Sequence, residues 1–241
     1  MAKRKKICHF AKNRLPGVCR RKFDFFEARR YISSGISPFV SKLRSQGKME
    51  LEQALKERRT VRKFTQEPLS DDILRSLVDA ARLASCARND QRLRYAVVRS
   101  PGKVKALFPL TAWAGAVAPR RNPVPGVSAP TAFIAVLGKS SEAQSALLQA
   151  DCGAAIQSLQ LAAWGRGVGC CWMGAIDRKA IHELLELPEE LSVLYVVALG
   201  YPAERPVSED VDDPAQVKYY LDDDDLLHVP KLSVDALTCW K

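Results

Sequence analysis

The stretch EAQSALLQADCGAAIQSLQLAAWGRGVGCCWM, residues 142–173, carries the most informative pattern in this sequence. As far as Trp164 it reads as a helix with Ala, Gly, Cys and Ser on several faces. A helix that is apolar and small-sided nearly all round lies at the centre of a fold, where its neighbours approach closely. Gly165 and Gly167 then stop the helix, and residues 168–173 have the length and apolarity of a buried strand. The stretch therefore predicts a central helix followed directly by a core strand.

Shorter helices and apolar strands alternate on both sides of this stretch. Helices are expected at 50–58, after Ser70 as N-cap, from Pro101, and from Asp177 as N-cap through Leu185. Strands are expected at 95–98, 133–137 and 191–199. The proline-rich residues 109–130 predict a long loop or lid, and the chain beyond Tyr201 is polar, with an acidic run at 222–225. This alternation predicts an α+β domain with helices on both faces of one sheet.

Length and composition exclude several classes of protein. The chain has 241 residues, of which 47% are hydrophobic and 27% charged. Such a chain buries a substantial core, and it is neither wholly disordered nor a coiled coil. No apolar run approaches the ~18 residues that a membrane-spanning helix needs. The basic start at 3–6 is not followed by the apolar stretch of a secretory signal. We therefore expect a cytoplasmic protein with no membrane partner.

The net charge of +10 is concentrated at the N-terminus. Residues 1–48 contain fourteen basic and two acidic residues, whereas the remainder is slightly acidic. Such a block often contacts nucleic acid, an anionic membrane or a partner subunit. Aromatic residues alternate with its charges, so a solvated or dimer-wrapping extension is the simpler interpretation. The sequence thus predicts a basic extension over 1–48 and a folded domain over 49–241.

Motifs for several common chemistries are missing. The chain has no GxGxxG, no GxxxxGK[ST], no HExxH and no GxSxG. Its seven cysteines form no CxxC pair and it has only three histidines. Hydrolase chemistry and a metal site are therefore unsupported. Cys152, Cys170 and Cys171 are interpreted as small core residues.

The strongest local feature is the basic cluster Arg58-Arg59-Thr60-Val61-Arg62 at the end of a predicted helix. Arginine offers forked donors and threonine a short hydroxyl, and together they suit a phosphate group. Taken alone, the cluster also fits a solvated helix end.

The cluster begins a series of motifs that resembles the FMN-dependent nitroreductase superfamily. RRTVRKF at 58–64 is followed by Pro68 and by a helix ending in DAARLA at 79–84. SCARNDQRLRY at 85–95 is similar to the superfamily's Pro-Ser-x-x-Asn-x-Gln-Pro-Trp-x-Phe, with Asn89 and Gln91 matching. DCGAAIQ at 151–157, GVGCCWMG at 167–174 and LGYP at 199–202 continue the resemblance in order.

The resemblance implies a fold and an assembly. It implies a nitroreductase-like three-layer sandwich, in which helices flank a central, mostly antiparallel sheet. It also implies a homodimer with two FMN sites at the interface.

The resemblance also implies which residues bind the cofactor. The FMN phosphate and ribityl chain would be held by Arg58, Arg59 and Thr60, with Lys231 as a further phosphate-binding base. Arg62 would lie near the pyrimidine edge, where a cation stabilises reduced FMN. The turn from Ser85 and Cys86 to Asn89 would reach the flavin of the other subunit. Trp172, Met173 and Gly174 would lie against the ring face or edge.

The implied function is ping-pong hydride transfer from NADH or NADPH through FMN to a small electron-poor acceptor, such as a nitroaromatic or a quinone. This chemistry needs no catalytic side chain of the protein's own. The sequence departs from the pattern at Ser85-Cys86 and at Arg92-Leu93. Arg92 adds charge near the expected substrate mouth, which favours an anionic substrate. The alternative is a flavin-poor binding protein that acts through residues 1–48, for example on nucleic acid.

Overall fold

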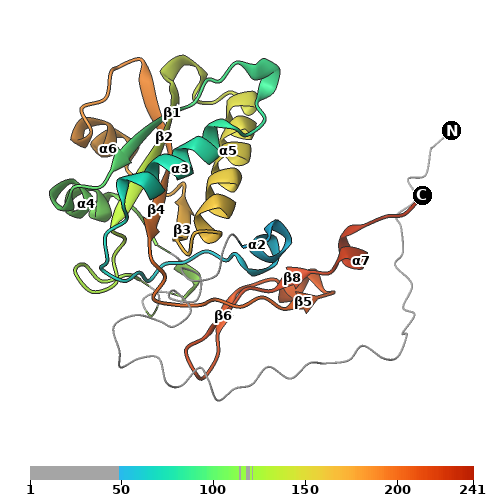
Figure 1. The fold of residues 1–241 in the computed structure, drawn as a ribbon. Helices are drawn as coiled ribbons and strands as arrows, with labels where there is room; N and C mark the ends of the chain where they lie inside the picture. Colours follow the sequence, from blue (N-terminus) through green and yellow to red (C-terminus); the bar gives the residue numbers. More distant parts are fainter. Residues whose placement is uncertain (1–48, 114, 118–119, 121) are drawn as a thin grey trace, which may run out of the picture. The chain divides into compact units, whose positions relative to one another are not determined.

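A four-stranded antiparallel sheet forms the middle layer of the fold (Figure 1). The computed structural model describes residues 49–113, 115–117, 120 and 122–241. In order across the sheet, the strands are β1 (Arg94–Val98), β2 (Ala132–Lys139), β4 (Leu191–Gly200) and β3 (Gly169–Met173). All three neighbouring pairs are antiparallel. The central strands β2 and β4 are almost wholly buried, as expected for strands covered on both faces.

Helices cover both faces of this sheet, as predicted. On one face α3 (Asp71–Arg82) and α5 (Ala146–Trp164) pack on Ile134 and Val136 of β2. On the other, α4 (Pro101–Leu107) and α6 (Arg178–Leu184) pack on Phe133 and Ala135. Successive side chains of a strand point to opposite faces, so β2 contributes to two separate hydrophobic clusters. The result is the predicted three-layer α+β sandwich.

The ends of the helices follow local sequence signals. Ser70 accepts a hydrogen bond from the Ile73 N–H at the start of α3, and Asp177 accepts one from the Ala180 N–H at the start of α6. Both are the N-caps that the sequence predicts. The central helix α5 begins at Ala146, four residues later than expected. Residues 140–142 instead form a 3-10 turn, whose Ser140 N–H donates to the Glu190 carbonyl beside β4.

The C-terminal segment contains structure that the sequence did not predict. Strand β5 (Asp210–Val211) pairs in parallel with β8 (Lys231–Leu232), and β6 (Tyr220–Leu221) pairs antiparallel with β7 (Leu227–His228). Helix α2 (Leu51–Glu57) precedes the sandwich, and α7 (Val234–Leu237) follows it. The remaining short helices are η2 (Ala87–Asn89), η3 (Phe108–Leu110), η4 (Gly115–Val117), η5 (Ser140–Glu142) and η6 (Pro214–Gln216). Two-residue strands are too short to produce a periodic pattern.

The acidic run at 222–225 has defined partners. Asp225 pairs with Arg120 at 2.7 Å, and Asp222 lies 3.0 Å from Nε2 of His228. The run therefore connects the β6–β7 hairpin to the proline-rich segment.

Two expectations from the sequence concern membrane-spanning helices and the N-terminal residues. Among the described residues, no helix is long and apolar enough to span a membrane. The basic extension predicted at 1–48 lies outside the described residues, and its separation from the folded domain stays a prediction.

Candidate functional site

The segment at 58–64 runs as an extended strip beside the edge strand β3. The Val61 N–H donates to the Cys170 carbonyl at 3.1 Å, and the Ala203 N–H donates to the Lys63 carbonyl at 2.9 Å. Arg59 and Val61 are buried, whereas Arg58, Thr60 and Arg62 are only half-buried. This alternation is that of extended backbone. It leaves three of the predicted cofactor-binding side chains accessible.

Two glycines allow the strip to approach the sheet. Gly169 and Gly200 are cross-strand partners at the edge of the β3–β4 pair. A Cβ atom at Gly169 would lie 2.8 Å from the Val61 Cβ, and one at Gly200 would lie 3.0 Å from the Phe64 Cβ. Both distances are too short for ordinary contact. The strip is therefore seated on backbone that has no side chain in the way.

Three cations converge next to this strip. Arg59 donates through Nη1 to the Arg58 carbonyl at 2.6 Å and through Nη2 to Ser208 Oγ. Burial and the charge of Arg58 lower the pKa of Arg59, while Asp210 acts in the opposite direction. Lys231 remains accessible to solvent, yet partial burial and the charges of Arg59 and Arg58 lower its pKa.

This cluster fits the phosphate of a nucleotide cofactor. Among the charged groups that shift the pKa values of Arg59 and Lys231, only Asp210 carries a negative charge. The Nε atom of Arg59 is buried and has no hydrogen-bond partner among the described residues. Buried donors normally have a partner, and a bound phosphate dianion would supply acceptors and negative charge together. The structure thus brings Lys231 to the neighbouring residues Arg58 and Arg59, which lie far from it in the sequence.

Arg62 is held separately from this cluster. Its guanidinium carbon lies 5.5 Å from the centroid of the Tyr219 ring, a cation–π distance. The Glu204 carboxylate accepts hydrogen bonds from the Arg62 N–H at 2.5 Å and from the Lys63 N–H at 3.2 Å. These contacts fix the strip on both sides of Arg62.

The predicted flavin-facing residues at the end of β3 point in different directions. Trp172 is 39% exposed and packs edge-on against Tyr195, with ring centroids 5.3 Å apart. The Met173 side chain is buried in the core cluster on the opposite face of the sheet. Gly174 is exposed, and a Cβ there would touch the Tyr195 ring at 3.4 Å. Trp172 and Gly174 are therefore accessible, whereas the Met173 side chain belongs to the core.

The loop at 85–92 contains the remaining predicted residues. Ser85 and Asn89 are exposed and Cys86 is half-buried. Arg88, Asn89 and Gln91 have φ values of 53°, 57° and 47°. The left-handed region costs a residue other than glycine about 1 kcal/mol or more. Asn tolerates this conformation, so Arg88 and Gln91 are the unusual residues of the loop.

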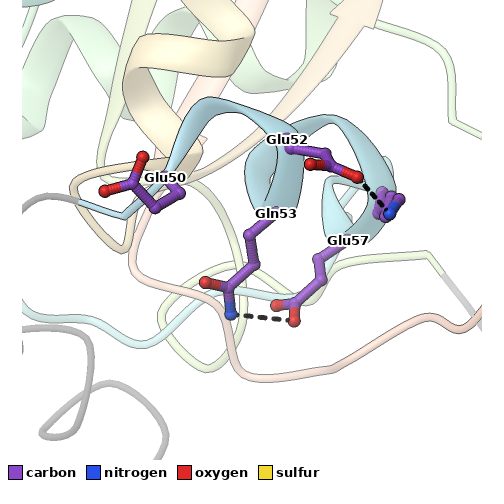
Figure 2. A pocket seen from close by; sticks show the side chains of 5 residues that line it. Glu50, Glu52, Gln53 and Glu57 are labelled. Carbon is purple, nitrogen blue, oxygen red and sulfur yellow. Dashed lines mark hydrogen bonds and ion pairs between the residues drawn. The ribbon is translucent and has the colours of Figure 1, made fainter.

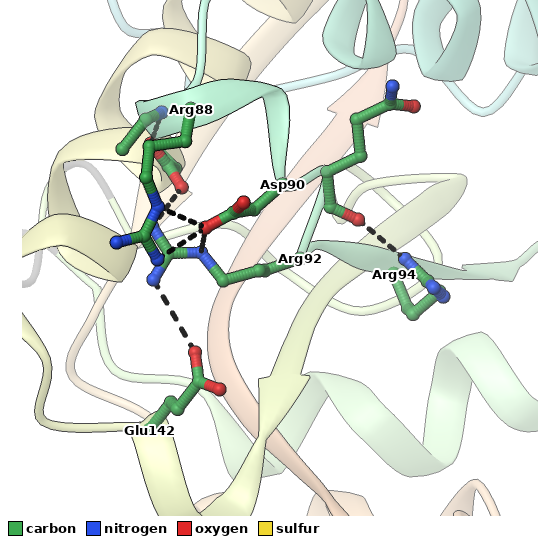
Figure 3. Close-up of polar contacts among 8 residues, drawn as sticks. Arg88, Asp90, Arg92, Arg94 and Glu142 are labelled. Carbon is green, nitrogen blue, oxygen red and sulfur yellow. Dashed lines mark hydrogen bonds and ion pairs between the residues drawn. The ribbon is translucent and has the colours of Figure 1, made fainter.

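The structure contradicts the expectation that Arg92 offers a free charge near the substrate. Its side chain is only 12% exposed and lies 2.9 Å from Asp151, 3.4 Å from Glu142 and 3.9 Å from Asp90 (Figure 3). The expectation was wrong because the three carboxylates come from α5, from η5 and from the loop itself. Burial alone would lower the pKa of Arg92, but these carboxylates raise it. Its charge is thus compensated within the chain.

The loop and the cation cluster lie toward opposite ends of α5. The loop contacts α5 near its start, since the Ala87 N–H donates to Asp151 Oδ1 at 2.9 Å. The strip contacts β3 at Cys170, just beyond the turn that follows Trp164. At 1.5 Å per residue, Asp151 and Trp164 are separated by about 20 Å along the helix. Within one chain, the two groups of predicted residues are therefore not adjacent (Figure 1).

Sequence reasoning missed the residues of the C-terminal segment that support the strip. Ser208, Asp210, Glu204 and Tyr219 all reach residues 59–63 from about 140 to 160 positions later in the chain. None of them belongs to a motif with fixed spacing. The nearest sequence signal was Lys231, which the resemblance already placed at the phosphate.

The buried cysteines have no part in this site. Burial raises the pKa of Cys170 to about 12 and that of Cys171 to about 11. Both thiols are therefore protonated near neutral pH and unreactive as nucleophiles. They pack as core residues, as predicted.

A hollow of about 340 Å³ along α2 is a separate feature. Figure 2 shows its lining of Glu50, Glu52, Gln53 and Glu57 on this short helix. The polar groups bond to one another, with Gln53 Nε2 donating to Glu57 at 3.1 Å and Lys56 donating to Glu52 at 2.5 Å. The lining is thus an ordinary solvated helix surface.

Comparison with known proteins agrees with this fold. A model of the nitroreductase family matches residues 55–201, which include the strip, α5, β3 and β4. A protein of Archaeoglobus fulgidus named NADH dehydrogenase/NAD(P)H nitroreductase is 31% identical over 160 residues, covering 65% of this chain and 87% of its own. A protein of the same name from Methanothermobacter thermautotrophicus is 29% identical over 174 residues, covering 70% of this chain and 86% of its own.

Solved structures share the fold. A crystal structure from Parabacteroides distasonis aligns with a TM-score of 0.55 at 21% identity, covering 70% of this chain and 96% of its own. An FMN-dependent nitroreductase of Clostridium difficile aligns with a TM-score of 0.53 at 22% identity, covering 65% of this chain and 90% of its own. At these identities the likeness concerns the fold alone, but the family model spans most of the sandwich. The chain belongs to the nitroreductase family.

Proposed function

We propose that this protein is an FMN-dependent oxidoreductase that uses NADH or NADPH to reduce a small electron-poor acceptor. The observation that carries the proposal is the cluster of Arg58, Lys231 and the buried Arg59, whose Nε has no hydrogen-bond partner among the described residues. Arg59 and Arg58 lower the pKa of Lys231, and a bound anion would offset this repulsion. The phosphate of FMN is an anion of the required charge and size. The names of the relatives support the NAD(P)H dependence.

The chain's own residues bind and orient the cofactor. Arg58, Arg59 and Lys231 would hold the phosphate, and the Thr60 hydroxyl would bind the ribityl chain. Arg62, held between Tyr219 and its backbone bond to Glu204, would supply positive charge to the flavin. Trp172 and the exposed backbone at Gly174 would contact the ring. When bound, FMN supplies the hydride-transfer chemistry, so no side chain has to move a proton for that step.

A second copy of the chain completes the site in this proposal. Ser85, Cys86 and Asn89 belong to the loop that contacts α5 at Asp151, whereas the strip with the cation cluster contacts β3 beyond Trp164, about 20 Å farther along the helix. In this proposal they reach the cofactor of a partner chain. We therefore propose a homodimer with two equivalent sites. Location in the cytoplasm and the identity of the acceptor stay predictions from the sequence.

The test is the visible spectrum of the purified protein after incubation with FMN and desalting. We expect stoichiometric FMN that bleaches on addition of NADH or NADPH. Arg58→Ala should weaken FMN binding by about 10- to 100-fold, because a hydrogen bond to a charged group contributes about 1.5–3 kcal/mol. Arg75→Ala, on the exposed surface of α3, is the matched control and should bind normally. A wild-type protein that retains no FMN would overturn the proposal.

A further inference from the structure

We propose that Asp151 and Arg92 are positioning residues, which hold the loop at 85–92 in the conformation that presents Asn89 to the cofactor of a partner chain. This inference rests on the proposed function, because it assigns the loop's exposed side chains to the FMN site. It adds two residues that do not themselves touch the cofactor. Neither pattern nor spacing in the sequence assigns them this role.

The loop at 85–92 needs an external support to keep its conformation. Arg88, Asn89 and Gln91 all adopt positive φ within four positions. Two local backbone bonds close the turn, from the Asn89 N–H to the Cys86 carbonyl at 3.2 Å and from the Asp90 N–H to the Ala87 carbonyl at 3.1 Å, and neither involves Arg88 or Gln91. Conformations of this kind persist when surrounding structure over-determines them.

Asp151 supplies this support from the core. It is 5% exposed and lies in the second turn of α5, a helix that the sandwich holds on one face. Its Oδ1 accepts from the Ala87 N–H at 2.9 Å, and its Oδ2 accepts from Arg92 Nη2 at 2.9 Å. The buried Asp151 carboxylate therefore binds the loop at Ala87 and at Arg92, on either side of the residues with positive φ.

Arg92 fixes the direction in which this support acts on the loop. Its buried guanidinium also reaches Glu142 and lies 3.9 Å from Asp90 within the loop (Figure 3). An arginine among three carboxylates is fixed in direction by its planar donors. At the far side, Arg94 Nη1 donates to the Gln91 carbonyl at 2.8 Å. Asn89 is left exposed at the tip of a loop whose base is fixed.

The experiment compares the full-length wild type with Asp151→Asn, Arg92→Gln, Arg92→Lys and the double variant Arg92→Gln/Asp151→Asn. Asp151→Asn keeps an oxygen for the Ala87 N–H but loses the charge that holds Arg92. The control is Arg99→Gln, which removes an exposed ion pair with Asp71 at 3.1 Å and makes the same change in charge as Arg92→Gln. Two quantities are measured: the Kd for FMN, and amide hydrogen exchange in peptides that cover 84–92 and β2.

We expect Asp151→Asn and Arg92→Gln each to raise the Kd for FMN about tenfold and to speed exchange in 84–92 by a similar factor. Exchange in β2 should not change. The double variant should be no worse than either single variant, because both act through one contact, and Arg92→Lys should recover part of the affinity. The Arg99→Gln control should match the wild type.

Two results would overturn the inference. One is an unchanged Kd and unchanged loop exchange in both single variants. The other is faster exchange throughout the protein, since Asp151 would then stabilise the whole fold rather than the loop. Failure of the proposed function looks different: the wild type itself would bind no FMN, while the exchange data would still report whether Asp151 holds the loop.

Discussion

Lys231 illustrates how a single residue can be unfavourable for stability and favourable for binding. Its pKa is lowered by burial and by Arg59 and Arg58, so its charge is disfavoured in the folded apoprotein. The same neighbours form the cluster to which we assign the cofactor phosphate. A residue that repels its neighbours when the site is empty and attracts the ligand when it is filled is typical of a functional site.

Lys231→Met should therefore have effects of opposite sign. The melting temperature of the apoprotein should rise slightly, because one of three mutually repelling charges is removed. The Kd for FMN should increase about tenfold, the expected loss for one phosphate contact. Lys105→Met, which removes an exposed lysine of α4, is the control and should change neither quantity.

The pH dependence of stability offers a second measure of the same residue. Between the lowered pKa of Lys231 and its ordinary value of 10.5, the unfolded chain binds this proton and the folded chain does not. The contribution of Lys231 to the free energy of unfolding therefore rises with pH in this window. Lys231→Met should remove this contribution, which comparison of urea unfolding at several pH values would detect. A Lys231→Met variant that is less stable than the wild type would contradict the repulsion assigned between Lys231 and the two arginines.

At the scale of elements, the position of the strip at 58–64 depends on its close packing against β3 and β4. The strip has one backbone bond to β3, from Val61 to Cys170, and its side chains Val61 and Phe64 lie on Gly169 and Gly200. Interiors are close-packed, so a single added methyl group must displace something. The displaced element would be the strip, since β4 lies in the middle of the sandwich.

Gly169→Ala should destabilise the protein by about 1–3 kcal/mol, the usual cost of overpacking. It should also weaken FMN binding, because the strip carries Arg58 and Arg59. Adding Val61→Ala to this variant should restore part of the stability, because the new methyl group clashes with the Val61 side chain. Gly102→Ala, where a Cβ meets nothing within 4 Å, is the control. Urea unfolding and FMN titration of the wild type, Gly169→Ala, Val61→Ala, the double variant and the control measure both effects, and additive effects of the two substitutions would argue against the contact.

At the scale of the whole molecule, the separation of the two residue groups determines how the cofactor site is assembled. The loop at 85–92 lies at the start of α5, and the cation cluster lies beyond its end. In the proposed homodimer, a site that uses both groups draws them from two chains. This leads to a test that depends on which chain carries which substitution.

Mixed dimers of differently tagged chains should distinguish a shared site from one within a single chain. With Arg58→Ala on one chain and Asn89→Ala on the other, a shared arrangement leaves one intact site, and about half of the FMN should be retained. With both substitutions on the same chain of a dimer, each site is damaged once and little FMN should remain. The measurement is bound FMN per dimer at a concentration between the wild-type and variant Kd values. The reverse pattern would place both residue groups at one site of the same chain.

The sequence alone determined the features of the fold that arise from contacts between neighbouring residues. The caps at Ser70 and Asp177, the four strands of the sheet and the small-sided central helix all follow from side chains within a few positions of one another. The ordered motifs from residue 58 to residue 202 predict the family, because each is a short run of neighbouring residues that can be read from the sequence. The cluster at 58–62 follows from the chemistry of its side chains and Lys231 from the resemblance, and their role in binding a phosphate stays a prediction.

The distribution of the charges and the identity of the residues that support the site depend on tertiary packing. Arg92 was expected to be free and is paired with Asp151, 59 positions away, while Arg59 donates to Ser208, 149 positions away. Such pairs leave no periodic trace, because each depends on where two unrelated segments pass each other. The same holds for the two-residue strands of the C-terminal segment and for the burial of Met173 beside an exposed Trp172. Local sequence specifies elements, whereas the compensation of a buried charge is settled by whichever distant carboxylate the packing brings within reach.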